Sequence, residues 1–257
     1  MSESFESPIA KGSWRLHKNE QSPLVAHEYV AGLGRVDQIW DCLAENHGQV
    51  IAVDAPHVTH PERYTYAEIA DRISTLSSAF LSIGIGKGDV VAIFSENSPR
   101  WLVADQAIMR TGACDAVRGV AAPVEELRYI LDDSNATGLV VQTADLWRSL
   151  SLIESERSRF KFVLQLEGLP EKGVISWDEV FSKGLGRPEV DSWRERGIDS
   201  AASTTATILY TSGTTGKPKG VPLSHANLLH QMRYLACVAY PPAGSAVLSV
   251  LPIWHAY

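Results

Sequence analysis

At 257 residues, 45% of them hydrophobic, the chain is long enough to bury the core of one large α/β domain or two small ones. Its formal net charge of −7 argues against a nucleic-acid-binding surface, so no nucleic acid is expected as a partner. The sequence has no run of about eighteen apolar residues and no N-terminal secretion signal. We therefore expect a cytoplasmic protein without a spanning helix, and contact with a membrane surface remains open.

The cysteines and histidines do not form a metal-binding pattern. Cys42, Cys114 and Cys237 lie far apart and suit neither a disulfide framework nor a C-x-x-C site. His57 and His60 stand in a proline-bounded loop without other ligand residues nearby. We expect reduced cysteines and no metal ligands among the side chains.

Residues 1–35 are polar and aperiodic, and we expect an extended N-terminal arm there. From residue 36 onward, hydrophobic periodicity, caps and glycine or proline breaks define the elements. Helices are predicted over 37–48, 69–83, 98–110, 123–131, 145–153, 177–181 and 224–239. Strands are predicted over 50–53, 90–94, 113–117, 138–141, 160–166, 208–210 and 246–251.

Strands and helices alternate along the chain with short connections. This alternation is typical of an α/β fold with a doubly wound, mostly parallel sheet flanked by helices. The run 90–94 is apolar throughout, as in a strand buried on both faces of such a sheet. Residues 168–203 fit the pattern poorly, and we interpret them as a surface excursion.

The densest group of chemistry-bearing residues follows the predicted strand 208–210. Residues 211–220 read T-S-G-T-T-G-K-P-K-G. Hydroxyls donate to phosphate oxygens, lysines add positive charge, and glycines let backbone N–H groups turn toward an anion. Ligands of open α/β sheets bind beyond the carboxyl ends of strands, where this stretch falls. We predict a phosphate-binding loop of Thr211, Ser212, Gly213, Thr214, Thr215, Gly216, Lys217, Lys219 and Gly220.

The predicted loop is not a Walker A loop, because Pro218 follows Lys217 where that motif needs Ser or Thr. Pro218 also keeps the segment extended, which can place Lys217 and Lys219 on opposite sides. We expect at most one of these lysines to reach the phosphates and favour Lys219. A solvated Gly/Thr/Lys loop is the alternative, and the clustering behind a buried strand disfavours it.

The stretch 211–220 resembles the signature of the adenylate-forming, or AMP-binding, enzymes, which include acyl-CoA synthetases, luciferases and peptide-synthetase adenylation domains. The resemblance implies that this loop wraps the β- and γ-phosphates of ATP. Residues 64–69 and 110–113 are similar to the first and second core motifs of the family, and we expect both to support the fold.

Two further stretches resemble particular parts of this family. The sequence D-A-V-R-G, starting at Asp115, is similar to the branch that activates long-chain fatty acids, including acyl-carrier-protein synthetases. We expect Asp115 and Arg118 to form a plain ion pair or to anchor a loop. The final L-P-I-W-H-A-Y is similar to the next family motif, whose aromatic–histidine pair borders the acyl pocket. The resemblance implies Trp254 and His255 as substrate-binding residues and His255 as catalytic, with a merely structural histidine as the alternative.

The resemblance implies a two-step reaction. A fatty acid carboxylate attacks the α-phosphate of Mg²⁺-bound ATP, and coenzyme A or an acyl-carrier protein then takes the acyl group from the adenylate. The downstream Y-G-x-T-E motif and the C-terminal domain of the family fall outside these 257 residues. We therefore expect residues 36–257 to form a partial N-terminal AMP-binding domain, a fragment inactive as a ligase by itself. The alternatives are a non-catalytic nucleotide- or acyl-binding module, or half of a split enzyme that pairs with a complementary C-terminal half.

Overall fold

The structure is a computed structural model that describes residues 32–58, 61–169, 171–182, 202–211, 217–238 and 246–252, without the side chains of 235–238. Most of the predicted N-terminal arm lies outside the described residues. The centre of the predicted phosphate loop, residues 212–216, and the pair Trp254 and His255 also lie outside them.

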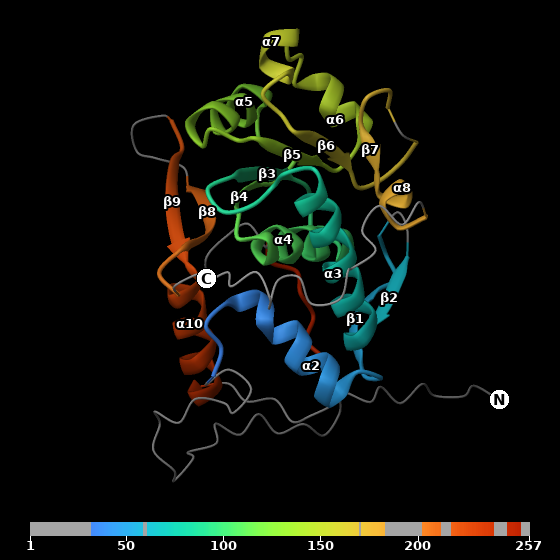
Figure 1. Ribbon diagram of the computed structural model, residues 1–257, viewed down its shortest axis with the longest axis vertical. Coiled ribbons are helices and arrows are strands. Elements are labelled where there is room, and N and C mark those ends of the chain that lie inside the picture. Colours follow the sequence, from blue (N-terminus) through green and yellow to red (C-terminus); the bar gives the residue numbers. More distant parts are fainter. Residues whose placement is uncertain are drawn as a thin grey trace, which may run out of the picture.

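Seven strands form the central sheet, in the order β7-β6-β5-β3-β4-β8-β9 (Figure 1). All neighbours from β7 to β8 run parallel, and only β9 is antiparallel, against β8. The prediction of a mostly parallel sheet is confirmed. The strands are β3 (Val90–Phe94), β4 (Cys114–Arg118), β5 (Gly138–Val141), β6 (Phe162–Gln165), β7 (Ile175–Ser176), β8 (Thr205–Thr211) and β9 (Lys219–Ser224).

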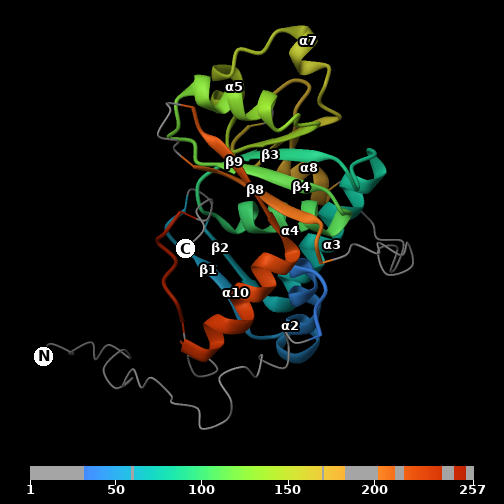
Figure 2. The same cartoon turned by 90° about the vertical axis from the view of Figure 1, so that its left-hand side faces the viewer.

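Helices cover both faces of this sheet (Figures 1 and 2). On one face lie α3 (Tyr66–Ser82) and α4 (Pro99–Thr111), and on the other α5 (Val124–Asp133) and α6 (Ala144–Ser149). The other elements are η1 (Val36–Gln38), α2 (Ile39–His47), α7 (Glu154–Arg157), α8 (Trp177–Ser182), α10 (His225–Val238), and the antiparallel pair β1 (Ile51–Ala55) and β2 (Glu62–Thr65).

Each face of the sheet has its own apolar core, and β3 contributes to both. Val91 and Ile93 pack with α3 and α4, whereas Ala92 and Phe94 pack with α5. Side chains of a strand point alternately to opposite faces, so a strand covered on both sides must be apolar throughout. This explains the continuous apolar run that the sequence shows at 90–94.

The local sequence determines where the two long helices begin. Thr65 and Glu68 form a capping box on α3: the Glu68 N–H donates to Thr65 Oγ1 at 3.2 Å, and the Thr65 N–H donates to Glu68 Oε2 at 2.8 Å. In α4, Ser98 Oγ accepts from the N–H of Trp101 at 3.0 Å, and Pro99 occupies the first turn. Gly112 ends α4 with a φ of 86°, which glycine adopts without strain.

Four sequence interpretations of elements differ from the structure. The surface excursion expected over 168–203 is wrong in part, because Ile175–Ser176 joins the central sheet as β7 and both Trp177 and Val180 are buried in the core. The predicted strand 246–251 is not a strand, because residues 246–250 have no ladder partner among the described residues and are exposed. The predicted helix 145–153 is shorter, since α6 ends at Ser149 and Ser151 takes a φ of 48° before α7. Strands β2, β7 and β9 were not predicted; β7 has only two residues, and β9 contains Gly220 and Pro222, which are poor strand signals.

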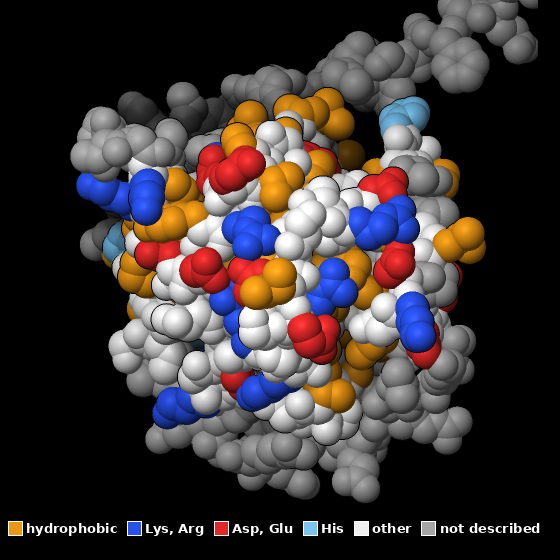
Figure 3. Space-filling view, turned by 90° about the horizontal axis from the view of Figure 1, so that it is seen from above, with side chains coloured by type: hydrophobic (Ala, Val, Ile, Leu, Met, Phe, Trp, Pro, Cys, Tyr) orange, Lys and Arg blue, Asp and Glu red, His pale blue; other side chains and the backbone are white. Residues whose placement is uncertain are grey.

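The outer surface over α5 to α7 carries both signs of charge side by side (Figure 3). Ion pairs join α5 to its neighbours there, including Arg128 with Glu156 at 2.7 Å and Arg159 with Asp132 at 2.6 Å. Such exposed pairs stabilise a fold by about 0–1 kcal/mol each. No helix of the described residues combines the length and apolar character needed to cross a membrane.

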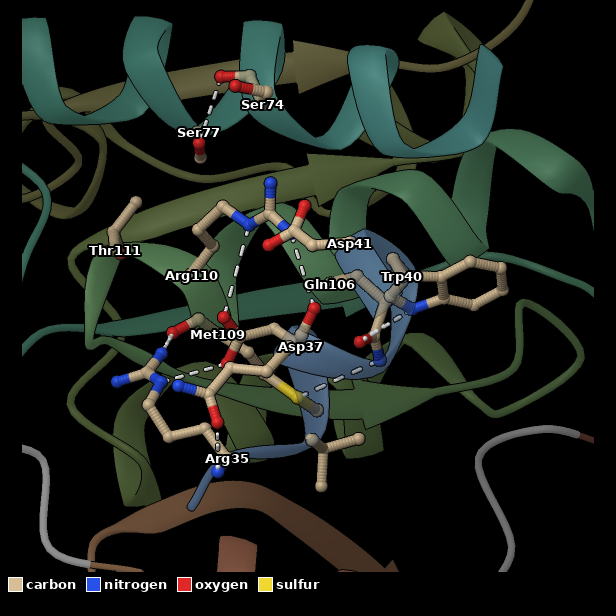
Figure 4. A network of polar contacts seen from close by, with 12 residues as sticks. Arg35, Asp37, Trp40, Asp41, Ser74, Ser77, Gln106, Met109, Arg110 and Thr111 are labelled. Carbon is tan, nitrogen blue, oxygen red and sulfur yellow. Dashed lines mark hydrogen bonds and ion pairs between the residues drawn. The ribbon is translucent and has the colours of Figure 1, made fainter. Parts of the chain in front are cut away.

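A buried polar network fastens η1 to α4 (Figure 4). Arg35 pairs with Asp37 at 2.9 Å and also donates to the carbonyl of Met109 in the last turn of α4. Arg110 donates to Asp41 Oδ1 at 3.0 Å and to the carbonyl of Asp37 at 3.2 Å. Arg110 is therefore a fold-supporting residue, as the sequence predicted for its motif.

Candidate functional site

The carboxyl ends of β3, β4, β5 and β8 meet at one edge of the sheet, because these strands are parallel. β4 and β5 flank β3 on opposite sides, so the chain reverses its direction of winding at β3. Hydrogen bonds join the loops at this edge: the N–H of Glu96 donates to Gln142 Oε1 at 3.1 Å, and the N–H of Val120 donates to Glu96 Oε1 at 3.1 Å. Ligands of doubly wound sheets bind at such an edge.

The predicted phosphate loop is the connection of a β-hairpin at this edge. β8 and β9 pair with Tyr210 opposite Gly220 and Thr211 opposite Lys219. The hairpin forms the side of the sheet next to β4 (Figure 2). Thr211 and Lys219 therefore lie opposite each other in the last strand pair before the connection. Of the nine predicted loop residues, the structure places four and leaves Ser212, Gly213, Thr214, Thr215 and Gly216 outside the described residues.

Gly220 serves close packing rather than backbone turning. It lies within β9, directly under the ring of Tyr210. A Cβ at this position would lie 3.1 Å from Tyr210 Cζ and 3.0 Å from Ile208 Cγ2. Gly220 thus lies in a strand and not in the connection of the hairpin, and a side chain there would crowd Ile208 and Tyr210; its contact with phosphate stays a prediction.

The two lysines of the stretch project to different sides of the hairpin. Lys217 Nζ lies 5.2 Å from the centre of the Tyr129 ring on α5. Gly220 faces Tyr210, which belongs to the core on the α5 side, so its neighbour Lys219 projects from the opposite face. Both lysines are exposed. Lys219 therefore lies on the face of the hairpin that points away from α5.

Arg118 is a loop anchor, whereas Asp115 is a buried residue of the core. Arg118 pairs with Glu126 of α5 at 2.7 Å and donates to the Tyr210 carbonyl at 3.4 Å, where β8 ends. Asp115 is fully buried and forms no ion pair among the described residues; it faces Asp105 of α4 instead. The expected ion pair of Asp115 and Arg118 is wrong, because strand alternation and the register of β4 turn Asp115 into the core.

His225 joins the base of the hairpin to the N-terminal part of the fold. It follows β9 directly, is 1% exposed, and its Nδ1 accepts from the N–H of Val36 at 3.3 Å. Burial, together with the nearby Arg35 guanidinium, lowers the pKa of His225 to about 4. The imidazole is therefore neutral near pH 7 and acts as a hydrogen-bond acceptor, not as a cation.

The segment that leads toward Trp254 and His255 reaches the same edge of the sheet. Asn97, in the loop after β3, donates from Nδ2 to the carbonyl of Leu251 at 2.8 Å. β3 and β8 are two strand spacings apart, roughly 10 Å. Pro252 is the last residue that the structure describes before Trp254. The assignment of Trp254 and His255 to the site stays a prediction.

The sequence patterns do not predict the contacts that four residues make here: Asn97, Tyr129, Asp133 and Tyr210. Tyr129 and Asp133 are four residues apart on α5, a spacing that places two side chains on one helix face. The spacing alone predicts that Tyr129 and Asp133 are neighbours on α5. It does not predict their partner, because the fold brings α5 beside Tyr210, which is 77 residues further along the chain.

The fold is an open α/β sheet with a β-hairpin beside β4 at its carboxyl edge. The chain belongs to the AMP-binding enzyme family, whose pattern matches residues 42–257. It is 36% identical over 237 residues to a chloroplastic long-chain-fatty-acid–acyl-carrier-protein ligase of Arabidopsis thaliana, covering 86% of this chain and 32% of the relative. It is 32% identical over 197 residues to a long-chain-fatty-acid–CoA ligase of Mycobacterium tuberculosis, covering 74% and 32%. The chain thus spans about a third of the length of these relatives.

Solved structures show the same fold. A long-chain-fatty-acid–CoA ligase of Archaeoglobus fulgidus superposes with a TM-score of 0.65 at 26% identity, over 85% of this chain and 42% of that one. A red-emitting luciferase of Phrixothrix hirtus superposes with a TM-score of 0.63 at 19% identity, over 84% and 39%. The second likeness supports the fold alone.

Proposed function

We propose that this chain is the phosphate- and acyl-binding part of an ATP-dependent long-chain fatty acid ligase. The carboxylate of the fatty acid attacks the α-phosphate of ATP, which forms the acyl-adenylate and displaces pyrophosphate. The thiol of coenzyme A or of an acyl-carrier protein then attacks the acyl carbon and displaces AMP. Family membership supports this proposal, as do the names of the relatives, which are ligases for long-chain fatty acids with either acceptor.

The observation that carries the proposal is the position of the β8–β9 hairpin at the carboxyl edge of the sheet. Attack on ATP requires that the charge of the departing pyrophosphate be balanced and the carboxylate be held in line. Thr211, Lys219 and the intervening hydroxyl and glycine residues are proposed to bind the β- and γ-phosphates. Trp254 and His255 are proposed to border the carboxylate and the entry of the acyl chain.

Magnesium is proposed to arrive with ATP rather than in a site of its own. Within the ranges that the structure describes, no three His, Cys, Asp or Glu side chains gather closely enough to hold a metal ion. Magnesium binds hard oxygen ligands and keeps several waters, so the phosphates themselves supply what it needs.

Binding of ATP to the hairpin is tested by calorimetric titration of the 257-residue chain and two variants. Combining Thr214→Ala with Lys219→Ala removes one hydroxyl donor and one charge, and affinity is expected to fall about 10–100-fold, as for lost charge-assisted hydrogen bonds. Lys87→Ala is the matched control, because this exposed lysine precedes β3 at the opposite edge of the sheet. Equal affinity of the double variant and the wild type would refute the assignment of the loop.

Turnover distinguishes the ligase proposal from a binding module. We propose that these residues bind ATP but do not complete the reaction alone, because in the family the chemistry is spread over a much longer chain. Pyrophosphate release is measured with palmitate and ATP, first for the chain alone and then with the remaining two thirds of a relative's length supplied as a second polypeptide. Release only in the presence of the second polypeptide supports a ligase part; binding without release in either case supports a non-catalytic module. Rapid release by the chain alone contradicts its proposed incompleteness.

A further inference from the structure

Helix α5 contacts a described residue on each side of the proposed phosphate loop. Before the loop, the Tyr210 hydroxyl donates to Asp133 Oδ2 at 2.8 Å. After the loop, Lys217 Nζ lies 5.2 Å from the centre of the Tyr129 ring. The Tyr129 hydroxyl donates to the other oxygen of the same carboxylate, Asp133 Oδ1, at 3.0 Å. The Asp133 carboxylate therefore bonds directly to Tyr210 of β8 and is linked to Lys217 through Tyr129.

The geometry around Tyr210 shows that this contact is specific. Tyr210 is 2% exposed, and its ring covers Gly220 so closely that a Cβ there would lie 3.2 Å from the hydroxyl oxygen. Arg118 makes a second tie to α5 at the same point, through the Tyr210 carbonyl and Glu126. Two contacts thus hold Tyr210 with its hydroxyl toward Asp133: the packing of its ring on Gly220 and the hydrogen bond from Arg118 to its carbonyl.

The contact between Lys217 and Tyr129 is that of a cation over an aromatic face. The ring carries a hydroxyl that donates to a carboxylate, and the same interaction raises the pKa of Tyr129. Donation of the proton toward Asp133 makes the ring richer in electrons and a better partner for an ammonium group. The carboxylate of Asp133 also adds negative potential on the side of α5 that Lys217 approaches.

We propose that Tyr129 and Asp133 are positioning residues for phosphate recognition: they hold Tyr210 at the end of β8 and Lys217 just before β9, and so fix where the hairpin presents Lys219. Lys217 then acts as the anchor of the loop on α5, and Lys219, on the other face of the hairpin, supplies the charge to the phosphates. This inference rests on the proposed function of the loop and deepens it. Its physical basis is preorganisation, since residues such as Tyr210 and Lys217 that are held in advance lose less conformational freedom when a ligand binds beside them.

The first experiment tests the contact without any ligand. Lysine side chains are labelled by reductive ¹³C-methylation, and the methyl resonance of Lys217 is assigned with Lys217→Arg. A ring-current shift is expected in the wild type, retained in Tyr129→Phe and lost in Tyr129→Leu, which separates the ring from its hydroxyl. Asp132→Asn is the matched control, because Asp132 precedes Asp133 but pairs with Arg159. An unshifted Lys217 resonance in the wild type contradicts the anchor.

The second experiment measures the affinity for inorganic pyrophosphate by calorimetry. Tyr129→Leu and Asp133→Asn are expected to weaken binding about 3–10-fold, with Tyr129→Phe between them and the wild type. In a Lys217→Ala background, Tyr129→Leu is expected to have no further effect, which a general loss of stability would not reproduce. Melting temperatures recorded on the same samples identify variants that fail to fold, and Tyr129→Phe then decides.

The outcomes separate this inference from the function on which it rests. If Lys219→Ala weakens pyrophosphate binding while the variants of Tyr129 and Asp133 bind as the wild type does, the loop binds phosphate and the positioning role is wrong. If the wild type binds no pyrophosphate, the proposed function of the loop fails and this inference fails with it. Additive effects of Lys217→Ala and Tyr129→Leu would also overturn it, because they would show that the two residues act independently.

Discussion

At the scale of single residues, the most unusual feature is a pair of carboxyl groups in the core. Asp105 of α4 is 5% exposed, and Asp115 of β4 is not exposed at all. Gln106 Nε2 donates to Asp105 at 2.7 Å, and Thr207 of β8 faces Asp115. Burial raises the pKa of both groups, and for Asp115 the neighbouring Asp105 raises it further. Two adjacent carboxylates in a dry core are unfavourable, so the pair holds a proton.

This pair predicts a particular dependence of stability on pH. The folded pKa values lie above the ordinary value of about 3.9, so the stabilising effect of the bound proton is complete below about pH 4 and is lost as the pH rises through the raised values. Asp115→Asn supplies an amide donor to Asp105 without a second charge. It is expected to increase the free energy of unfolding by about 1–3 kcal/mol at pH 8 and by less at pH 4.

Urea unfolding of wild type and Asp115→Asn at several pH values between 4 and 8 checks this prediction. His225 acts in the opposite direction, because its lowered pKa makes folding less favourable as the pH falls from about 6.5 toward 4. The difference between variant and wild type removes that contribution. A difference that does not change with pH would show that the pair binds no extra proton.

At the scale of elements, the contact between β5 and β6 depends on a missing side chain. Gly138 starts β5 and pairs with Phe162 of β6, whose ring lies over it. A Cβ on Gly138 would lie 2.4 Å from Phe162 Cε1. The ring also packs against Phe80 of α3, with their centres 4.8 Å apart, so it has little room to move.

Gly138→Ala is therefore expected to destabilise the fold by about 1–3 kcal/mol, the usual cost of overpacking a core. Gly86→Ala is the control, because a Cβ there would meet only the Thr111 carbonyl, at an ordinary 3.8 Å, and a change within about 0.5 kcal/mol is expected. Combining Gly138→Ala with Phe162→Leu should recover part of the loss, since the smaller side chain vacates the space. Thermal and urea unfolding measure all three; equal stability of Gly138→Ala and Gly86→Ala would contradict the packing argument.

Elements with a strong local signal were predictable from sequence, and elements that depend on distant partners were not. α3 has an apolar face with a period close to 3.6 and a capping box, and α4 has a serine cap, a proline and a terminal glycine. By contrast, β9 is a strand because β8 lies beside it, despite Gly220 and Pro222. Residues 246–250 have strand-like composition but no partner among the described residues. Pairing is a property of the fold, so composition alone decides such segments poorly.

The same division applies to the candidate site. The hydroxyl, glycine and lysine residues of 211–220 form one continuous stretch, for which composition alone predicts phosphate binding. Their support comes from Tyr129 and Asp133 of α5 and from Arg118, none of which adjoins that stretch in the sequence. Residues that act by holding others carry no motif of their own, so only the fold reveals them.

At the scale of the whole molecule, η1 holds together parts of the chain that are far apart in sequence (Figure 4). Arg35 and Asp37 are buried, with side-chain exposures of 6% and 2%, and Arg35 also binds the carbonyl of Met109 in α4. Val36, between them, donates to His225 at the start of α10. The base of the β8–β9 hairpin is thereby connected to α4 through Arg35, Val36 and Asp37.

Arg35→Met leaves the buried carboxylate of Asp37 without its nearest cation, and loss of one partner of a buried pair costs about 3–5 kcal/mol. We expect the free energy of unfolding to fall by about 3 kcal/mol, because Arg110 remains 3.9 Å from Asp37 and retains part of the compensation. Adding Asp37→Leu to Arg35→Met should restore part of this loss by removing the unpaired charge. Arg63→Met is the matched control: its partner Asp54 is 3.5 Å away on the surface, and a change below about 1 kcal/mol is expected. Urea unfolding of the four proteins decides, and a double variant less stable than Arg35→Met would mean that Asp37 supports the fold through contacts other than this ion pair.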